Sequence, residues 1–138
     1  MKYIGIWLDK DKAHVVTLMK EHEKMKTIES NIEHFHPAGG SGTKAKGGPQ
    51  DVVQDSKYLE REKHQHKAYF KSIVPHLKGA HNLAIFGPAQ TGERFAKHLE
   101  NYNHMLFMKL KGVEKADSMT LNQVKAMVRD YFGIQNEI

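Results

Sequence analysis

The first third of the chain alternates between two sides in the manner of β-strands. In residues 2–9, one side carries Tyr3, Gly5, Trp7 and Asp9, and the other carries Ile4, Ile6 and Leu8. Residues 9–12 predict a turn, and residues 13–20 predict a second strand that pairs antiparallel with the first. Residues 24–35 predict a third, more polar strand that packs through Met25, Thr27 and Ile32.

A helical repeat replaces the alternation over residues 51–77. Val52, Leu59, His66 and Ile73 recur every seven residues, and most other apolar residues of this segment lie in its second half. We therefore expect the second half of the helix to pack on a sheet and the first half to project into solvent. Pro75 should kink or end the helix, because proline cannot donate a backbone hydrogen bond.

The rest of the chain predicts two more strands and two more helices. Residues 81–87 and 104–110 are short, continuously apolar runs, as expected for buried parallel strands. Residues 87–102 predict a helix with Pro88 at an early position. Residues 120–132 predict another, in which Thr120 and Gln123 form a capping box. Its buried stripe is expected at Leu121, Val124, Met127 or Val128, and Tyr131.

This order predicts an α/β fold in a single domain over residues 1–138. An antiparallel meander should join parallel crossover strands in one mixed sheet that packs with helices. Between the meander and the first helix, residues 36–50 predict a flexible loop that holds five of the eleven glycines. A connection of this length inside a compact domain is uncommon, and it is usually functional or disordered.

The segment "KGGPQDVVQDSKYLEREKHQHKAYFKSI" resembles the central domain of eukaryotic and archaeal class-I peptide-chain release factors and their Pelota-type relatives. In that family, a glycine-rich loop bearing Gly-Gly-Gln leads into a long basic helix. Here Gly47-Gly48-Pro49-Gln50 stands at that place. "HNLAIFGPAQTGERFAKHLE" resembles the strand, turn and helix that follow. The opening "IGIWLDKDKAHVV" is similar to small bacterial stand-alone members of the group.

The resemblance implies a sheet of the ribonuclease H-like, translational-machinery type and a role at the ribosome. It also implies that Gly47, Gly48 and Gln50 are candidate catalytic residues for hydrolysis of the peptidyl-tRNA ester. Pro49 interrupts the family tripeptide, fixes φ and removes one backbone N–H. Since the family mechanism depends on a backbone N–H near the developing oxyanion, we favour binding to ribosomal RNA or tRNA over hydrolysis. The binding would serve ribosome rescue or simply occupy the site.

The residues themselves also favour a polyanionic partner. The net charge is +5 with histidines neutral, which suits RNA. Glycines around two of the lysines would let the backbone approach phosphates closely. The candidate RNA contacts are Lys44, Lys46, Lys57, Arg61, Lys63, His64 and Lys67. Glu60 and Glu62 interleave these bases, so a solvated helix face is the simpler alternative. A protein-interaction module with a disordered loop is a third possibility.

Other chemistry has little support in the sequence. There is no cysteine, which excludes disulfides and thiolate sites. The histidines match no metal-binding motif, and no GxGxxG or GK[ST] motif is present, so we expect neither a metal nor a cofactor. Asp9 and Asp11 fit a turn better than a metal site. The first residues do not form a signal peptide, and no segment reaches the ~20 apolar residues of a membrane span. We therefore expect a cytoplasmic protein.

Overall fold

The structure is a computed structural model, which describes residues 1–32 and 49–134, with side chains from residue 60 onward in the second range. The strands are β1 (Tyr3–Leu8), β2 (Lys12–Met19), β3 (His22–Glu29), β4 (Asn82–Gly87) and β5 (Leu110–Lys115). The helices are α2 (Pro49–Ile73), the 3₁₀ helix η2 (Val74–Leu77), α3 (Thr91–Tyr102), α4 (His104–Phe107) and α5 (Leu121–Phe132).

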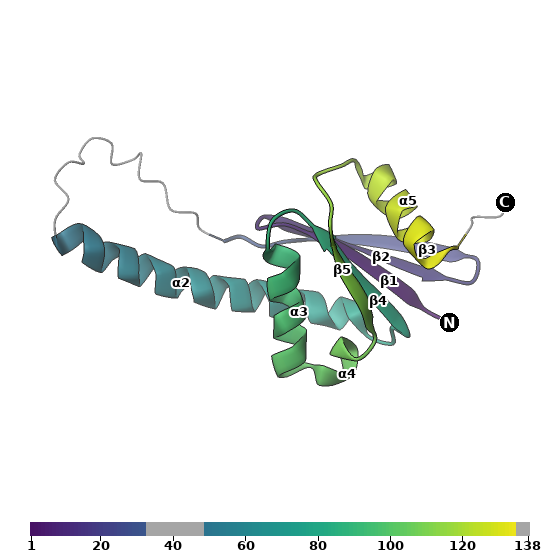
Figure 1. Cartoon of the computed structure of the whole chain (residues 1–138), viewed down its shortest axis with the longest axis horizontal. Helices are drawn as coiled ribbons and strands as arrows, with labels where there is room; N and C mark the ends of the chain where they lie inside the picture. Colours follow the sequence, from purple (N-terminus) through teal and green to yellow (C-terminus); the bar gives the residue numbers. More distant parts are fainter. Residues whose placement is uncertain (33–48, 135–138) are drawn as a thin grey trace.

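The five strands form one mixed sheet in the order β3-β2-β1-β4-β5 (Figure 1). β1, β2 and β3 pair antiparallel, whereas β4 pairs parallel with both β1 and β5. Each parallel pair needs a crossover connection, and α2 and α3 supply helices for these two crossovers. The predicted α/β fold, an antiparallel meander joined to parallel crossover strands, is therefore confirmed.

The alternation in β1 separates two hydrophobic cores, one on each face of the sheet. Ile4, Ile6 and Leu8 lie in the core that α2 and α3 cover. On the other face, Trp7 is 1% exposed and packs in the core that α5 covers. Its indole Nε1 donates a 3.0 Å hydrogen bond to the carbonyl of Ala116. Trp7 therefore belongs to the core, and its polar atom is satisfied.

Close packing of α5 requires glycine at the middle of β1. A β-carbon at Gly5 would lie 2.5 and 2.6 Å from the two γ-methyl groups of Val128. Glycine at this position therefore lets α5 approach β1 this closely. The helix begins with the predicted capping box. The Gln123 N–H donates to the Thr120 hydroxyl, and the Thr120 N–H donates to the Gln123 side chain.

Three details differ from the sequence-based expectations. Residues 104–110 are not a buried strand: they contain α4, and β5 begins only at Leu110. A short apolar run rich in Met and Leu suits a helical turn as well as a strand, and periodicity cannot separate them. Pro88 precedes α3, which begins at Thr91. Leu121 is 45% exposed, because the buried stripe of α5 starts one turn later at Val124.

The third strand is also shorter than predicted, since β3 ends at Glu29. Met25 and Ile28 are half-buried on opposite faces of this strand, and Ile32 is buried just beyond it. In the ranges that the structure describes, no helix combines the length and the apolar character that crossing a bilayer requires.

Candidate nucleic-acid interface

The long helix α2 is the most prominent feature beyond the sheet. Its 25 residues correspond to about 37 Å at 1.5 Å per residue. It begins at Pro49, two residues before the predicted start at Asp51. Proline suits the first helical position because its φ is already helical and its missing N–H would have no partner there. Gln50 is therefore a helical residue, whereas Gly47 and Gly48 lie outside the described residues.

Among the side chains of α2 that the structure describes, those that anchor the helix lie in its C-terminal part. Tyr69, Phe70 and Ile73 are buried in the core between α2, α3 and the sheet. Phe70 lies 5.3 Å from Phe95 of α3, measured between ring centroids. Burying each such side chain is worth about 1.5–3 kcal/mol, so a few of them can hold the helix end in place. At Pro75 the α-helix has already given way to η2, which buries Leu77.

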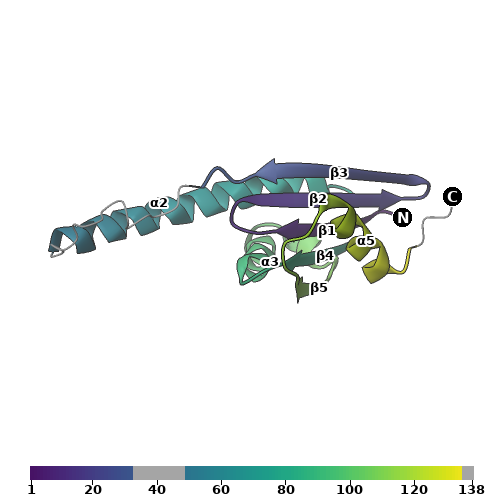
Figure 2. The ribbon, with the colours of Figure 1, turned by 90° about the horizontal axis from the view of Figure 1, so that it is seen from above.

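The other end of α2 continues past the ends of the strands (Figure 1 and Figure 2). Between residues 60 and 68, no side chain is fully buried. The predicted division of the helix into a packed second half and a projecting first half is therefore confirmed. We call this projecting part of α2, residues 49–68, the arm.

Five of the six bases on α2 whose side chains are described are exposed, and His66 is the exception. Arg61, Lys63, His64, Lys67 and Lys71 are all exposed. His64 and Lys71 are seven residues apart and share one stripe, while Tyr69 and Ile73 lie on the opposite, buried side. Glu62 is turned inward: its carboxylate lies 3.9 Å from the imidazole of His66, and both side chains are largely shielded. Glu60 is the acid that remains among these exposed bases.

One base of the arm is held by an aromatic ring of α3. The Lys67 ammonium lies 4.6 Å from the ring centroid of Tyr102, a cation–π contact. Tyr102 is 62% exposed and lies 4.9 Å from the ring of His98. Burial lowers the pKa of His98, and the positive charges of Lys67 and Lys71 lower that pKa further. A neutral imidazole therefore lies beneath this part of the basic side.

The structure brings some of the predicted RNA contacts together and leaves others undescribed. Arg61, Lys63, His64 and Lys67 are all exposed along one stretch of α2. Arg61 and His64, and His64 and Lys67, are three residues apart and therefore neighbours on the helix surface. Lys57 belongs to the same helix, but its side chain lies outside the description. Lys44 and Lys46 fall outside the described residues, as does most of the predicted loop at 36–50. Their contact with RNA stays a prediction.

Sequence reasoning missed Tyr102 as part of this surface. The residue is the last one in α3, and its contact with Lys67 depends on how α3 packs against α2. The one available signal was its spacing of seven from Phe95 and three from Leu99, which indicates a helical neighbourhood but not an exposed ring.

Asp9 and Asp11 form the predicted turn. The Asp9 carboxylate accepts hydrogen bonds from the backbone N–H groups of Asp11 and Lys12, at 2.8 and 2.9 Å. Asp9 is thus engaged by the chain itself, as in an Asx turn. Within the described ranges, no group of three histidines or carboxylates is placed to hold a metal ion.

No protein-family model and no curated protein matches the sequence. Solved structures do match. The archaeal translation termination factor aRF1 aligns with a TM-score of 0.55 and 14% identity over 96% of this chain. The Pelota protein of Thermoplasma acidophilum aligns with a TM-score of 0.54 and 18% identity over 96% of this chain. A structure described as "Archaeal protein" gives 0.53 and 16% over the same share.

This chain covers 35%, 33% and 34% of those three chains. At these identities the similarity concerns the fold. It agrees with the resemblance inferred from the sequence, although no family model supports that resemblance at the sequence level. The comparisons therefore show that this chain has the α/β fold found in about one third of the archaeal termination factor and of Pelota.

Proposed function

We propose that this chain is a ribosome-associated binding protein of the translation machinery, related to the central domain of class-I release factors. In this proposal, the arm and residues 36–48 before it contact the phosphates of ribosomal RNA or tRNA. The contacts would come from Lys44, Lys46, Lys57, Arg61, Lys63, His64 and Lys67. The protein would act in the rescue of stalled ribosomes, or it would simply occupy the ribosomal site that release factors enter. Because ribosomes are its proposed partner, we also propose that it acts in the cytoplasm.

The observation that carries the proposal is the geometry of α2. A helix anchored at one end by Tyr69, Phe70 and Ile73 holds its other end away from the body. Exposed bases are distributed along the described part of this helix, and Glu62 is turned toward His66. A projecting, positively charged helix can enter a cavity lined with phosphates, whereas a flat protein surface cannot. Its positive charge favours binding to those phosphates. The fold that this chain shares with part of a translation termination factor also supports a role in translation.

We favour binding over hydrolysis of peptidyl-tRNA. Pro49 is the first residue of α2, so Gln50 is held in helical geometry rather than in a free loop. In the family, the glutamine directly follows the two glycines; here it follows a proline that lacks an N–H. Gly47, Gly48 and Gln50 thus remain candidates for a catalytic role that the sequence disfavours.

Co-sedimentation with purified ribosomes over a salt series tests the proposal. Because phosphate contacts release counterions, the affinity should fall steeply between low and physiological salt. Binding that hardly changes over this range, or no binding at low salt, would overturn the proposal. Removing residues 39–48 should weaken the binding; unchanged association of that deletion variant would favour the alternative of a protein-interaction module.

A further inference from the structure

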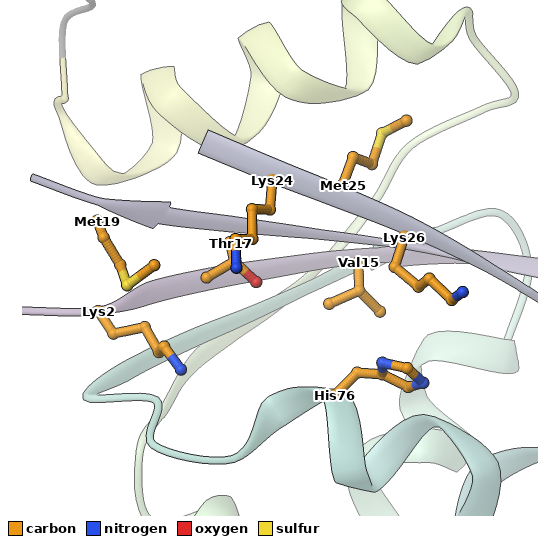
Figure 3. Close-up of a pocket in the computed structure, with 8 residues that line it drawn as sticks. All are labelled: Lys2, Val15, Thr17, Met19, Lys24, Met25, Lys26 and His76. Atoms are coloured by element: carbon orange, nitrogen blue, oxygen red, sulfur yellow. The ribbon is translucent and has the colours of Figure 1, made fainter. Parts of the chain in front are cut away.

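A basic cleft lies on the sheet between the edge strand β3 and the 3₁₀ helix η2 (Figure 3). It has a volume of about 520 Å³, within the range of small-molecule sites. Four basic side chains from three separate parts of the chain line it: Lys2, Lys24, Lys26 and His76. Among the described residues that line it, there is no carboxylate.

The alternation of side chains along β3 places its lysines on one face of the sheet and its glutamates on the other. Lys24 and Lys26 pair with Thr17 and Val15 of β2, so they share the face that those two residues form. Glu23 and Glu29 occupy the alternate positions and therefore point to the opposite face. There, Glu23 pairs with Arg129 and Lys125 of α5. The acids of the strand are thus kept away from the cleft.

Two further bases reach the cleft from elsewhere. The Lys2 ammonium donates a 2.9 Å hydrogen bond to the carbonyl of Lys78, which fixes its position beside η2. His76 comes from η2 itself and faces the strands across the cleft (Figure 3). Lys24 and Lys26 have no ion pair within the described part of the chain. Three lysine side chains and His76 therefore line one cleft.

Lysines on an edge strand also protect a sheet from pairing with other chains. That role requires charge on the strand, but it does not require Lys2 and His76 to line the same cleft. It also does not explain the apolar part of the lining, which comes mainly from the half-buried Met19, because Val15 is only 2% exposed. The combination is typical of a site for a ligand with an anionic group and an apolar or flat body.

We propose that this cleft binds a phosphomonoester of the nucleotide class. Its phosphate would accept hydrogen bonds from the lysines that line the cleft, Lys2, Lys24 and Lys26, and its organic body would lie against Met19. The same chemistry is offered by a free mononucleotide and by the 5′-phosphate end of a polynucleotide. The site is separate from the arm, and the inference does not depend on the proposed ribosome contact.

Amide chemical shifts of the full chain, recorded at constant ionic strength, test this site. The probes are inorganic phosphate, adenosine 5′-monophosphate, and a single-stranded oligoribonucleotide with and without a 5′-phosphate. We expect saturable shifts at Lys2, Lys24, Lys26 and His76 with the nucleotide, and binding at least about tenfold tighter than that of inorganic phosphate. If the 5′-phosphorylated oligonucleotide binds more tightly at the same residues, the polynucleotide end is the source of the ligand.

Two double variants, each of which removes two lysine charges, provide the test and its control. Lys24→Gln with Lys26→Gln should weaken nucleotide binding by about tenfold or more, because two charge-assisted contacts are lost. Lys111→Gln with Lys115→Gln alters exposed positions on the opposite edge strand, β5, and should leave the affinity unchanged. All these positions are exposed, so circular dichroism should report an intact fold. Absence of saturable shifts in the cleft, or equal affinities for both double variants, would overturn the proposal.

Discussion

The hydroxyl of Tyr69 donates a 3.0 Å hydrogen bond to the backbone carbonyl of Asp9, which is 60 residues earlier in the chain. This contact ties the anchored part of α2 to the turn between β1 and β2. Burial raises the pKa of Tyr69, and Asp9 and Asp11 raise that pKa further, so the hydroxyl stays a donor at physiological pH. The Asp9 carboxylate stabilises the turn through its own hydrogen bonds.

Tyr69→Phe should lower the free energy of unfolding by about 1 kcal/mol, the usual net value of one hydrogen bond. The ring still fills the core, so the loss reports the contact with Asp9 alone. Urea unfolding measures it. Tyr102→Phe, which removes a hydroxyl from a ring that is 62% exposed, is the control and should change stability little. Equal stabilities for the two variants would show that the Tyr69–Asp9 contact does not hold the helix.

Gly5→Ala should destabilise the protein by about 1–3 kcal/mol through overpacking. The added methyl would meet both γ-methyl groups of Val128. A double-mutant cycle with Val128→Ala provides the decisive comparison: the smaller side chain should accommodate the methyl group, so the double variant should be more stable than the sum of the single changes predicts. Simple additivity would mean that α5 does not approach β1 this closely.

Two buried histidines make stability depend on pH. Burial lowers the pKa of His14, with Lys12 acting in the same direction and Asp9 opposing it. For His98, burial is again the main cause, and Lys67 and Lys71 add to it. Since the unfolded chain then binds more protons, their contribution is fully present above the unfolded pKa of about 6.5 and is lost as the pH falls through the folded pKa.

We therefore expect the free energy of unfolding to decrease as the pH is lowered below about 6.5. His98→Gln should reduce this pH dependence, whereas His22→Gln, at an exposed position of β3, should leave it as in the wild type. Denaturant unfolding at several pH values between neutrality and mild acid measures the slopes. A wild-type stability that rises on acidification would contradict the lowered pKa values.

Much of the fold could be predicted from the sequence because period-two alternation decides which face of a sheet each residue occupies. Ile4 and Trp7 lie on opposite faces of the sheet, as predicted, and the Thr120–Gln123 pair marks the start of α5. The prediction of a buried strand at 104–110 was wrong, because this short apolar run forms a helical turn that packs against its neighbours. Hydrophobicity alone does not separate a short helix from a strand. The contact between Tyr102 and Lys67 could not be predicted either, because it depends on the tertiary packing of α3 against α2.

The basic cleft could not have been found in the same way. Lys24 and Lys26 could be assigned to one face of a strand, but Lys2 and His76 join them only through the packing of η2. Along the chain, these four residues look like ordinary surface bases. Charge patterning in sequence predicts which side of an element is basic, but not which elements meet.

A peptide-release assay on ribosomes loaded with peptidyl-tRNA separates binding from hydrolysis. We expect release by the wild-type chain to be indistinguishable from background, because Pro49 displaces Gln50 from the family position. Release that Gly47→Ala or Gly48→Ala abolishes would instead assign the loop a catalytic role. Release that survives both substitutions would reject this mechanism and point to other residues.

The most direct test of the central claim compares the salt dependence of ribosome binding between two triple variants. Arg61→Gln, Lys63→Gln and Lys67→Gln remove bases from the arm, and glutamine preserves helix propensity. Lys10→Gln, Lys20→Gln and Lys111→Gln remove the same charge from exposed positions elsewhere. If the arm contacts RNA phosphates, the slope of log K against log salt should become shallower by about 0.7 per lost contact in the arm variant alone. Equal slopes for both triple variants would contradict the claim that α2 carries the binding surface.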